Sequence, residues 1–318
     1  MPVPADAPDP RLIRALAERI FQPARQLAVE RVPEGGSTFV YRVVRSIETF
    51  YLRVLPEIGD SFAPEVHAHE LLRARGVLVP EVVYFEHLHP ELGYSVMATT
   101  EISGSPVASR PVDAATHDIM FAAGQQLAIL NTIHVAGFGW IKRDSASVVA
   151  LEADHPTLRA FVHEHLARDL AALEAHGLLT PAAVAAICRL ADVGDGWRDT
   201  GQATLAHGDF DLMHIFHQDG RYSGLIDFGE IRGTDPWYDL GYFWMHDGER
   251  QPTLLLPWLL AGYESVCPLP ADALRYIRRA SVLIALRAWA RSLERRPADA
   301  LRHRARTSIR RDLELLRG

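Results

Sequence analysis

Two aspartates in the second half of the chain stand in short polar segments that adjoin apolar runs. Asp209 lies in the segment HGDFDLMHIF, residues 207–216, and Asp227 opens the sequence DFG eighteen residues further on. An apolar segment on each side of the first loop would let a hairpin bring the two carboxylates together. One carboxylate could then accept the proton of an attacking hydroxyl, while the other held Mg²⁺ on nucleotide phosphates. The spacing therefore predicts phosphoryl transfer.

Histidines in the same region offer an alternative, a zinc hydrolase. His207, His214 and His217 follow the spacing H-x6-H-x2-H. The alternation of apolar and polar residues from 213 to 217 favours a strand or loop, and the chain has no H-E-x-x-H. A serine nucleophile is disfavoured as well, because no G-x-S-x-G is present. Phosphoryl transfer remains the stronger interpretation.

The segments around both aspartates resemble the aminoglycoside phosphotransferase and choline kinase-like family, which shares the protein-kinase-like fold. HGDFDLMHIF is similar to the catalytic loop H-G-D-x-x-x-x-N, and IDFGEI is similar to the metal-binding Asp-Phe-Gly segment. Gly233–Leu240 resembles the D-P-x-x-D-L stretch that follows, and the resemblance covers roughly residues 27–265. It implies transfer of the γ-phosphoryl group of ATP or GTP, with Mg²⁺, to a hydroxyl of a small molecule.

The resemblance implies a role for each residue of the two segments. Asp209 is expected to act as general base or to orient the acceptor hydroxyl, and Asp227 is expected to bind the metal. His207 should brace the loop, and Asp239 should support it from behind. His214 stands where the family usually has Asn, so it is a substitute metal ligand, a water-mediated contact or a spectator. Because Mg²⁺ prefers oxygen ligands, this departure leaves the choice between Mg²⁺ and Mn²⁺ open.

The nucleotide side is expected in the first hundred residues. Gly35, Gly36 and Ser37 lie in a turn between two predicted strands, where backbone N–H groups could cover phosphates. The turn is neither G-x-G-x-x-G nor a P-loop, and alone it is an ordinary hairpin turn. The segment 97–101, with Thr99 at its centre, would offer backbone groups to a purine.

The strand lysine of the family is missing, since Lys142 is the only lysine of the chain. Arg53 takes its place by the pattern, and a guanidinium can still contact phosphate in a bidentate manner. Its acidic partner is expected on the helix that follows. Glu65 and Glu70 are the candidates, and Glu65 is favoured because it stands one turn into that helix.

Periodicity predicts an α+β protein with a sheet lobe and a mostly helical lobe. The family resemblance implies that these two lobes have a protein-kinase-like arrangement. Residues 1–100 are expected to form a small antiparallel sheet with one helix packed on it, and residues 101–318 a larger, mostly helical lobe. Strands are predicted at 27–32, 38–44, 49–55, 82–87 and 93–99. Helices are predicted at 10–21, 62–75, 113–135, 156–176, 181–193, 236–246, 254–266, 271–295 and 298–315.

Composition restricts the partners of the chain. It has 318 residues, is 48% hydrophobic, and carries a net charge of -7, although its last 49 residues hold 13 arginines. These arginines alternate with apolar residues at helical spacing, so we expect no binding to nucleic acid. With two cysteines, no leader-like start and no run of about 20 apolar residues, a cytoplasmic, membrane-free monomer or homodimer is expected.

The sequence does not determine which small molecule accepts the phosphoryl group. Four acids near the proposed site favour a polycationic aminoglycoside: Asp211, Glu230, Asp247 and Glu249. Choline would instead want an aromatic cage, for which Trp237, Tyr238, Tyr242, Phe243 and Trp244 are available, although core packing explains their spacing better. Homoserine, methylthioribose, sugars and macrolides remain open. A catalytically impaired, nucleotide-binding relative is the other alternative, because positions 53 and 214 depart from the family.

Overall fold

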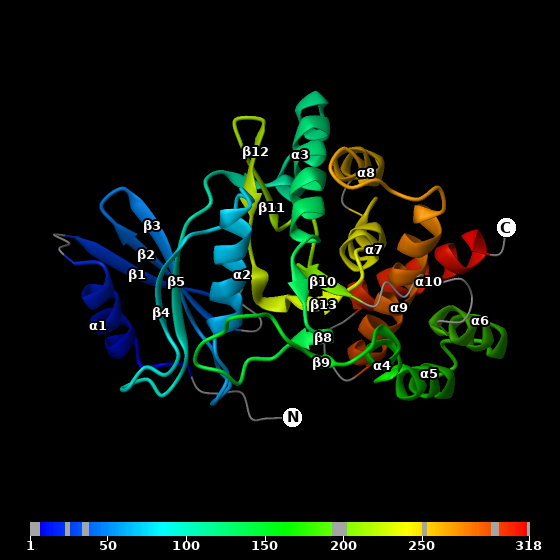
Figure 1. The fold of residues 1–318 in the computed structure, drawn as a ribbon, viewed down its shortest axis with the longest axis horizontal. Helices are drawn as coiled ribbons and strands as arrows, with labels where there is room; N and C mark the ends of the chain where they lie inside the picture. The colour runs from blue at the N-terminus through cyan, green and yellow to red at the C-terminus, as the bar shows by residue number, and fades with distance from the viewer. Residues whose placement is uncertain are drawn as a thin grey trace.

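The computed structural model describes residues 7–22, 26–33, 38–192, 202–249, 253–293 and 299–316. Figure 1 shows two lobes side by side, with a sheet at the N-terminal end and most of the helices at the other. The predicted α+β architecture of two lobes is confirmed. Among the described residues, no helix combines the length and apolar character that crossing a membrane requires.

The N-terminal lobe is an antiparallel sheet in the order β1-β2-β3-β5-β4. Successive side chains of a strand point to opposite faces, so Phe50 and Leu52 pack against α1 (Pro10–Ile20) while Arg53 points to the other face. That second face is covered by α2 (Ala63–Ala74). The strands are β1 (Leu27–Val32), β2 (Phe39–Arg45), β3 (Glu48–Val54), β4 (Val82–Glu86) and β5 (Val96–Thr100).

The C-terminal lobe combines two small sheets with eight helices among the residues described. The strand orders are β7-β10-β13-β8-β9 and β12-β11-β6. The strands are β6 (Ser105–Pro106), β7 (His134–Val135), β8 (Phe138–Ile141), β9 (Ala153–His155), β10 (Ala203–Ala206), β11 (Ile215–Gln218), β12 (Arg221–Leu225) and β13 (Arg232–Thr234). The helices are α3 (Ala114–Leu130), α4 (Leu158–His163), α5 (Leu166–Ala175), α6 (Pro181–Ala191), α7 (Trp237–His246), α8 (Leu256–Glu264), α9 (Ala273–Ser292) and α10 (Asp299–Leu315).

The hairpin of β11 and β12 positions the two segments around Asp209 and Asp227. Its strands are antiparallel, with Ile215 opposite Leu225. Residues 207–214 lead into β11, and Asp227 follows β12, so both segments lie at the same end of the hairpin. The hairpin expected from the sequence is thus present.

Two predicted helices are wrong in extent. The helix expected over 113–135 ends at Leu130, and residues 134–135 instead form β7, which pairs with β10. The helix expected over 156–176 is two helices, α4 and α5. Helix α4 packs on β8 and β9, whereas α5 packs on α9. The helix is therefore interrupted between them, because the two halves contact different elements.

The arginine-rich C-terminal segment belongs to the core of the helical lobe. Ile277, Leu286 and Trp289 of α9 are buried, Ile277 in one hydrophobic cluster and Leu286 and Trp289 in another. Asp312 of α10 is fully buried and accepts hydrogen bonds from the Ser281 hydroxyl at 2.7 Å and the Trp244 indole at 2.9 Å. The spacing of the arginines therefore follows from helix packing.

Candidate active site

The loop that carries Asp209 is held from behind by α7. The buried carboxylate of Asp239 accepts the backbone N–H groups of His207 and Gly208, both at 2.8 Å. Gly208 has a φ of 88°, and a Cβ there would lie 1.9 Å from the carbonyl oxygen of Glu230. Only glycine fits this position. Asp239 thus makes the contact that the family resemblance implies for it.

His207 joins this loop to the DFG segment. Its Nε2 donates to the Ile226 carbonyl at 2.9 Å, and its Nδ1 accepts the Asp209 N–H at 3.3 Å. The ring also packs against Phe228, with 4.7 Å between centroids. Burial lowers the pKa of His207, and the neighbouring His214 lowers it further. A neutral imidazole with its proton on Nε2 fits both hydrogen bonds.

His214 stands between the carboxylates of Asp209 and Asp227. Its Nδ1 lies 3.8 Å from Asp209 Oδ2, and its Nε2 lies 3.8 Å from Asp227 Oδ2. The Nδ1 proton is donated to the Asp209 carbonyl at 2.7 Å, which leaves Nε2 facing Asp227. Burial alone would lower the pKa of His214, but the carboxylates of Asp209, Asp211 and Asp227 outweigh burial and raise it. Both predicted acids thus face one imidazole.

Asp227 has the geometry of a strained functional residue. Its φ is 64°, in the left-handed region that few residues other than glycine adopt. Its Oδ1 lies 3.4 Å from the Gly229 N–H, and its side chain is 49% exposed. Burial raises the pKa of Asp227, but the charges of Arg53 and His214 outweigh that effect and hold it below its usual range. The side chain is therefore an exposed anion in a site of mixed charge.

Arg53 reaches across the lobes from β3. Its guanidinium forms an ion pair with Glu65 of α2, whose side chain is 1% exposed. The same guanidinium lies 3.9 Å from Asp227 Oδ1. Glu70 is 69% exposed and faces His67 instead. Of the two carboxylates considered for Arg53, the structure pairs it with Glu65.

Two segments were expected to contact the nucleotide: the turn with Gly35, Gly36 and Ser37, and the segment around Thr99. Gly35, Gly36 and Ser37 lie outside the described residues. Thr99 lies on β5 with a strand on each side. The N–H groups of Thr100 and Glu101 donate to the carbonyls of Glu81 and Thr49. Carbonyl oxygens therefore remain the better candidates for a purine contact in this segment.

The side chains around Asp227 fit a magnesium ion bound together with phosphates. In the described part of the chain, no three His, Cys, Asp or Glu side chains are grouped as a ready metal site. Mg²⁺ commonly binds through one or two protein carboxylates together with substrate phosphates, so it needs no such cage. The exposed carboxylate of Asp227 fits that requirement, and Nε2 of His214 is the nearest additional donor.

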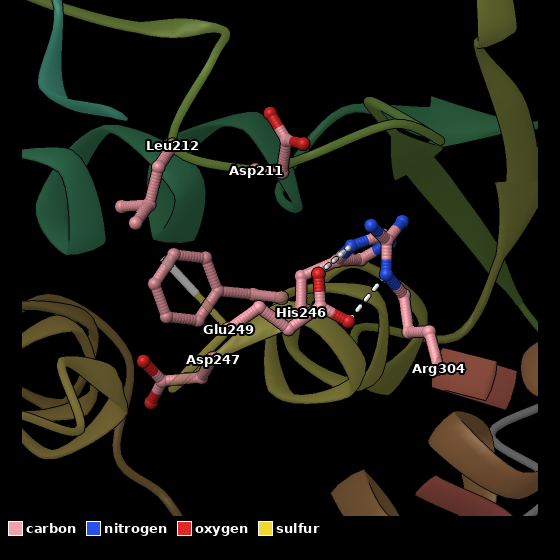
Figure 2. A pocket seen from close by; sticks show the side chains of 7 residues that line it. Asp211, Leu212, His246, Asp247, Glu249 and Arg304 are labelled. Carbon is pink, nitrogen blue, oxygen red and sulfur yellow. Dashed lines mark ion pairs between the residues drawn. The ribbon is translucent and has the colours of Figure 1, made fainter. Parts of the chain in front are cut away.

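A small recess, partly open to solvent, lies beside the loop that carries Asp209. Figure 2 shows it between the loop at Asp211, the end of α7 and Arg304 of α10. Glu249 forms an ion pair with Arg304 and lies 3.6 Å from His246 Nδ1. Three of the four predicted acids line this recess, and Glu230 does not. Its lining residues are Asp211, Leu212, Phe243, His246, Asp247, Glu249 and Arg304.

The aromatic residues of α7 contact separate partners. Trp237 stacks on Tyr276 with centroids 5.2 Å apart, and Trp244 donates to Asp312. Phe243 packs near Phe210 of the loop that carries Asp209, with ring centroids 6.1 Å apart, and Tyr242 lies close enough to Asp209 to be affected by its charge. Burial raises the pKa of Tyr242, and Asp209 raises it further. The spacing from Asp239 to Tyr242 is one helical turn, a signal that could have revealed this contact in the sequence.

Comparisons with known proteins agree with this geometry. The model of the phosphotransferase enzyme family matches residues 28–275. A comparison with curated protein sequences found no match. A thermostable mutant of aminoglycoside phosphotransferase APH(4)-Ia, in ternary complex with ADP and hygromycin B, has a TM-score of 0.68 at 15% identity over 96% of this chain and 98% of that chain.

Two further solved structures have the same fold. Macrolide 2′-phosphotransferase MphH from Brachybacterium faecium has a TM-score of 0.57 at 19% identity over 94% of this chain and 98% of its own. A candidate fructosamine-3-kinase from Thermobifida fusca has a TM-score of 0.64 at 19% identity over 94% and 99%. These likenesses establish the two-lobe, protein-kinase-like fold. The family match over most of the sequence places this chain in the phosphotransferase enzyme family.

Proposed function

We propose that this protein transfers the γ-phosphoryl group of ATP or GTP to a hydroxyl of a small molecule, most favourably an aminoglycoside-type antibiotic. The observation that carries the proposal is the pair of carboxylates of Asp209 and Asp227, which face the two nitrogens of His214 at 3.8 Å each. Phosphoryl transfer needs one carboxylate at the acceptor and one at the phosphates. The family membership supports the same reaction class.

Asp209 serves the acceptor in this proposal. Its carboxylate takes the hydroxyl proton as the acceptor oxygen forms a bond to the γ-phosphorus and the bond to the β-bridging oxygen breaks. Tyr242 of α7 lies close to that carboxylate, and burial together with the carboxylate charge raises the pKa of its hydroxyl. His207 fixes the backbone of Asp209 and stays neutral. Positioning of this kind accounts for most catalysis of phosphoryl transfer.

The nucleotide phosphates face Arg53 and Asp227. Arg53, held by Glu65, supplies positive charge to the phosphates in place of a lysine. Asp227, with His214 beside it, would hold Mg²⁺ at this position. The ion, when bound, neutralises phosphate charge. The segment around Thr99 belongs to the proposed nucleotide site, and the contribution of Gly35, Gly36 and Ser37, which lie outside the described residues, stays a prediction.

The acceptor class rests on the recess beside Asp211. Its three carboxylates exceed the single arginine that lines it, which favours a ligand with ammonium groups. One of these carboxylates, Asp247, already accepts the N–H groups of Leu255 and Leu256. Aminoglycosides carry several amines and hydroxyls. Solved structures of the same fold include enzymes named for aminoglycosides and macrolides.

One assay tests both the reaction and the acceptor. Release of ADP is measured with Mg-ATP and a panel of aminoglycosides, macrolides, choline, amino alcohols, homoserine and methylthioribose. We expect acceptor-dependent turnover with an aminoglycoside, and none from Asp209→Asn under the same conditions. Turnover with another member of the panel would correct the substrate class alone.

A catalytically impaired relative is the second candidate, and Arg53 and His214 favour it because both depart from the family pattern. This alternative predicts nucleotide binding without turnover on any member of the panel. Equal activity in wild type and Asp209→Asn would contradict both candidates. A cytoplasmic location, no binding to nucleic acid, and a monomeric or homodimeric state remain predictions.

A further inference from the structure

A second arginine reaches the Arg53–Glu65 pair from the opposite lobe. Arg143 lies in the loop between β8 and β9, which Figure 1 shows extending from the helical lobe toward α2. Its Nη2 donates to the Gly229 carbonyl at 2.7 Å and lies 4.0 Å from Glu65 Oε2. Arg143 therefore lies next to both the DFG segment and α2.

Glu65 has one oxygen left for such a partner. Its side chain is 1% exposed, and Oε1 is used by Arg53. No described residue hydrogen-bonds to Oε2. A buried carboxylate oxygen without a donor is unfavourable, and Nη2 of Arg143 is the guanidinium nitrogen recorded next to it. A small approach of the two lobes would complete a bond between them.

The contact to Gly229 connects Arg143 to Asp227. Gly229 donates its N–H to the Asp227 carboxylate at 3.4 Å, while its carbonyl accepts from Arg143. Arg143 thus restrains the peptide that follows Phe228, next to the left-handed backbone of Asp227. The same guanidinium faces the residue that holds Arg53.

The distribution of charge around Glu65 also supports a role for Arg143. Two guanidinium groups share one carboxylate at Glu65, whereas the pairing expected from the family places one cation on one anion. The additional positive charge lies between the two lobes, where the proposed nucleotide phosphates would add negative charge. A guanidinium also has five N–H donors in a fixed planar arrangement, which is enough to serve Gly229 and Glu65 together.

We propose that Arg143 is a positioning residue for the nucleotide: it connects α2 to the DFG segment, and nucleotide binding closes its bond to Glu65. This inference rests on the proposed function, since it assumes a nucleotide between the lobes. Arg143 acts through Glu65 and Gly229, and its own contact with phosphate is not required.

The experiment measures the affinity for Mg-AMP-PNP by isothermal titration calorimetry, which needs no knowledge of the acceptor. Arg143→Met should bind about tenfold more weakly than wild type, because a charge-assisted hydrogen bond is lost. Arg143→Lys should recover part of that loss. The matched control is Lys142→Met, the adjacent residue, whose exposed side chain pairs with Glu152 and which should bind as wild type does.

A double-mutant cycle with Glu65→Gln identifies the route of the effect. If Arg143 acts in part through Glu65, the loss of affinity caused by Arg143→Met should be smaller in the Glu65→Gln background than in the wild-type background, and the remainder reports the contact with Gly229. Once an acceptor is known, KM for the nucleotide should rise more than kcat falls, with KM for the acceptor unchanged. Thermal unfolding without ligand shows whether a variant is merely unstable. If Arg143→Met is unstable, Arg143→Lys takes its place in the binding measurements.

Several results would overturn the inference. They are wild-type affinity in Arg143→Met, equal weakening in Lys142→Met, and an undiminished loss in the Glu65→Gln background. A wild-type protein that binds no nucleotide would defeat the proposed function, and this inference with it. Wild-type binding with an unaffected Arg143→Met would defeat the inference alone.

Discussion

The proposed acceptor side and the proposed nucleotide side of the site are built differently. Around Asp209, backbone N–H groups donate to Asp239 at 2.8 Å, and His207 bonds to both segments within one lobe. Around Arg53, by contrast, charged groups from different lobes lie 3.9 to 4.0 Å apart, and one oxygen of Glu65 lacks a donor. The acceptor side is preorganised in this structure, and the nucleotide side has contacts left to form.

The comparison is tested most strongly by Asp209→Ala. We expect turnover to fall by at least about 100-fold, because the group that accepts the hydroxyl proton is removed. Affinity for Mg-ATP should change little, since Asp209 lies on the acceptor side. Steady-state kinetics and calorimetry on the same preparation check both statements, and full activity of the variant would disprove the role of Asp209.

Asp227→Ala should have the opposite signature. Because Asp227 would hold the metal on the phosphates, the thermal stabilisation by Mg-ATP should disappear. At 100 times Kd, the stabilisation lost would be about 2.7 kcal/mol. Thermal unfolding with and without Mg-ATP measures it, with Asp219→Ala at the remote turn between β11 and β12 as control. An unchanged shift in Asp227→Ala would rule out the metal role.

His214→Asn tests the position where the two sides meet. We expect turnover to stay within about tenfold of wild type, because an amide oxygen suits Mg²⁺ better than an imidazole nitrogen. Activity with Mg²⁺ and with Mn²⁺ should be compared for both proteins. An inactive variant would mean that imidazole chemistry is needed and that position 214 is more than a ligand position.

Asp235 provides a test outside the reaction. Burial raises the pKa of Asp235 to about 7, although Arg279 opposes the shift. The folded protein therefore keeps a proton on Asp235 that the unfolded chain releases near pH 4. As pH rises from about 4 to 7, Asp235 lowers the free energy of unfolding. The limiting slope is about 1.4 kcal/mol per pH unit.

The measurement for Asp235 is the free energy of unfolding across this range. Asp235→Asn should remove this share of the pH dependence, while its side-chain oxygen can still accept the Trp237 N–H that Asp235 accepts at 3.0 Å. Parallel stability curves for wild type and variant would contradict the shift. Nucleotide affinity at a fixed pH should be the same for both.

The sequence was most informative where chemistry and local pattern coincide. The order of His-Gly-Asp and Asp-Phe-Gly around a hairpin was sufficient to expect Asp209 and Asp227 together, and the family resemblance of Gly233–Leu240 added Asp239. Strands β7, β8 and β9 were missed because runs of two to four residues have no measurable period, and their pairing partners are distant in sequence. Arg143 was missed because the chain has 32 arginines and this one stands in a loop without a recognisable motif. Only the tertiary structure brings it close to Glu65.

The backbone at Gly208 restricts how this enzyme can change. Since any side chain there would collide with the carbonyl of Glu230, the loop that carries Asp209 tolerates no substitution at that position. In the recess, by contrast, Asp211, Glu249 and Arg304 make their contacts through side chains, as the hydrogen bond from Met213 to Asp211 and the Arg304–Glu249 ion pair show. Selection or directed evolution for new acceptors should therefore accumulate replacements in the recess and leave the glycine invariant.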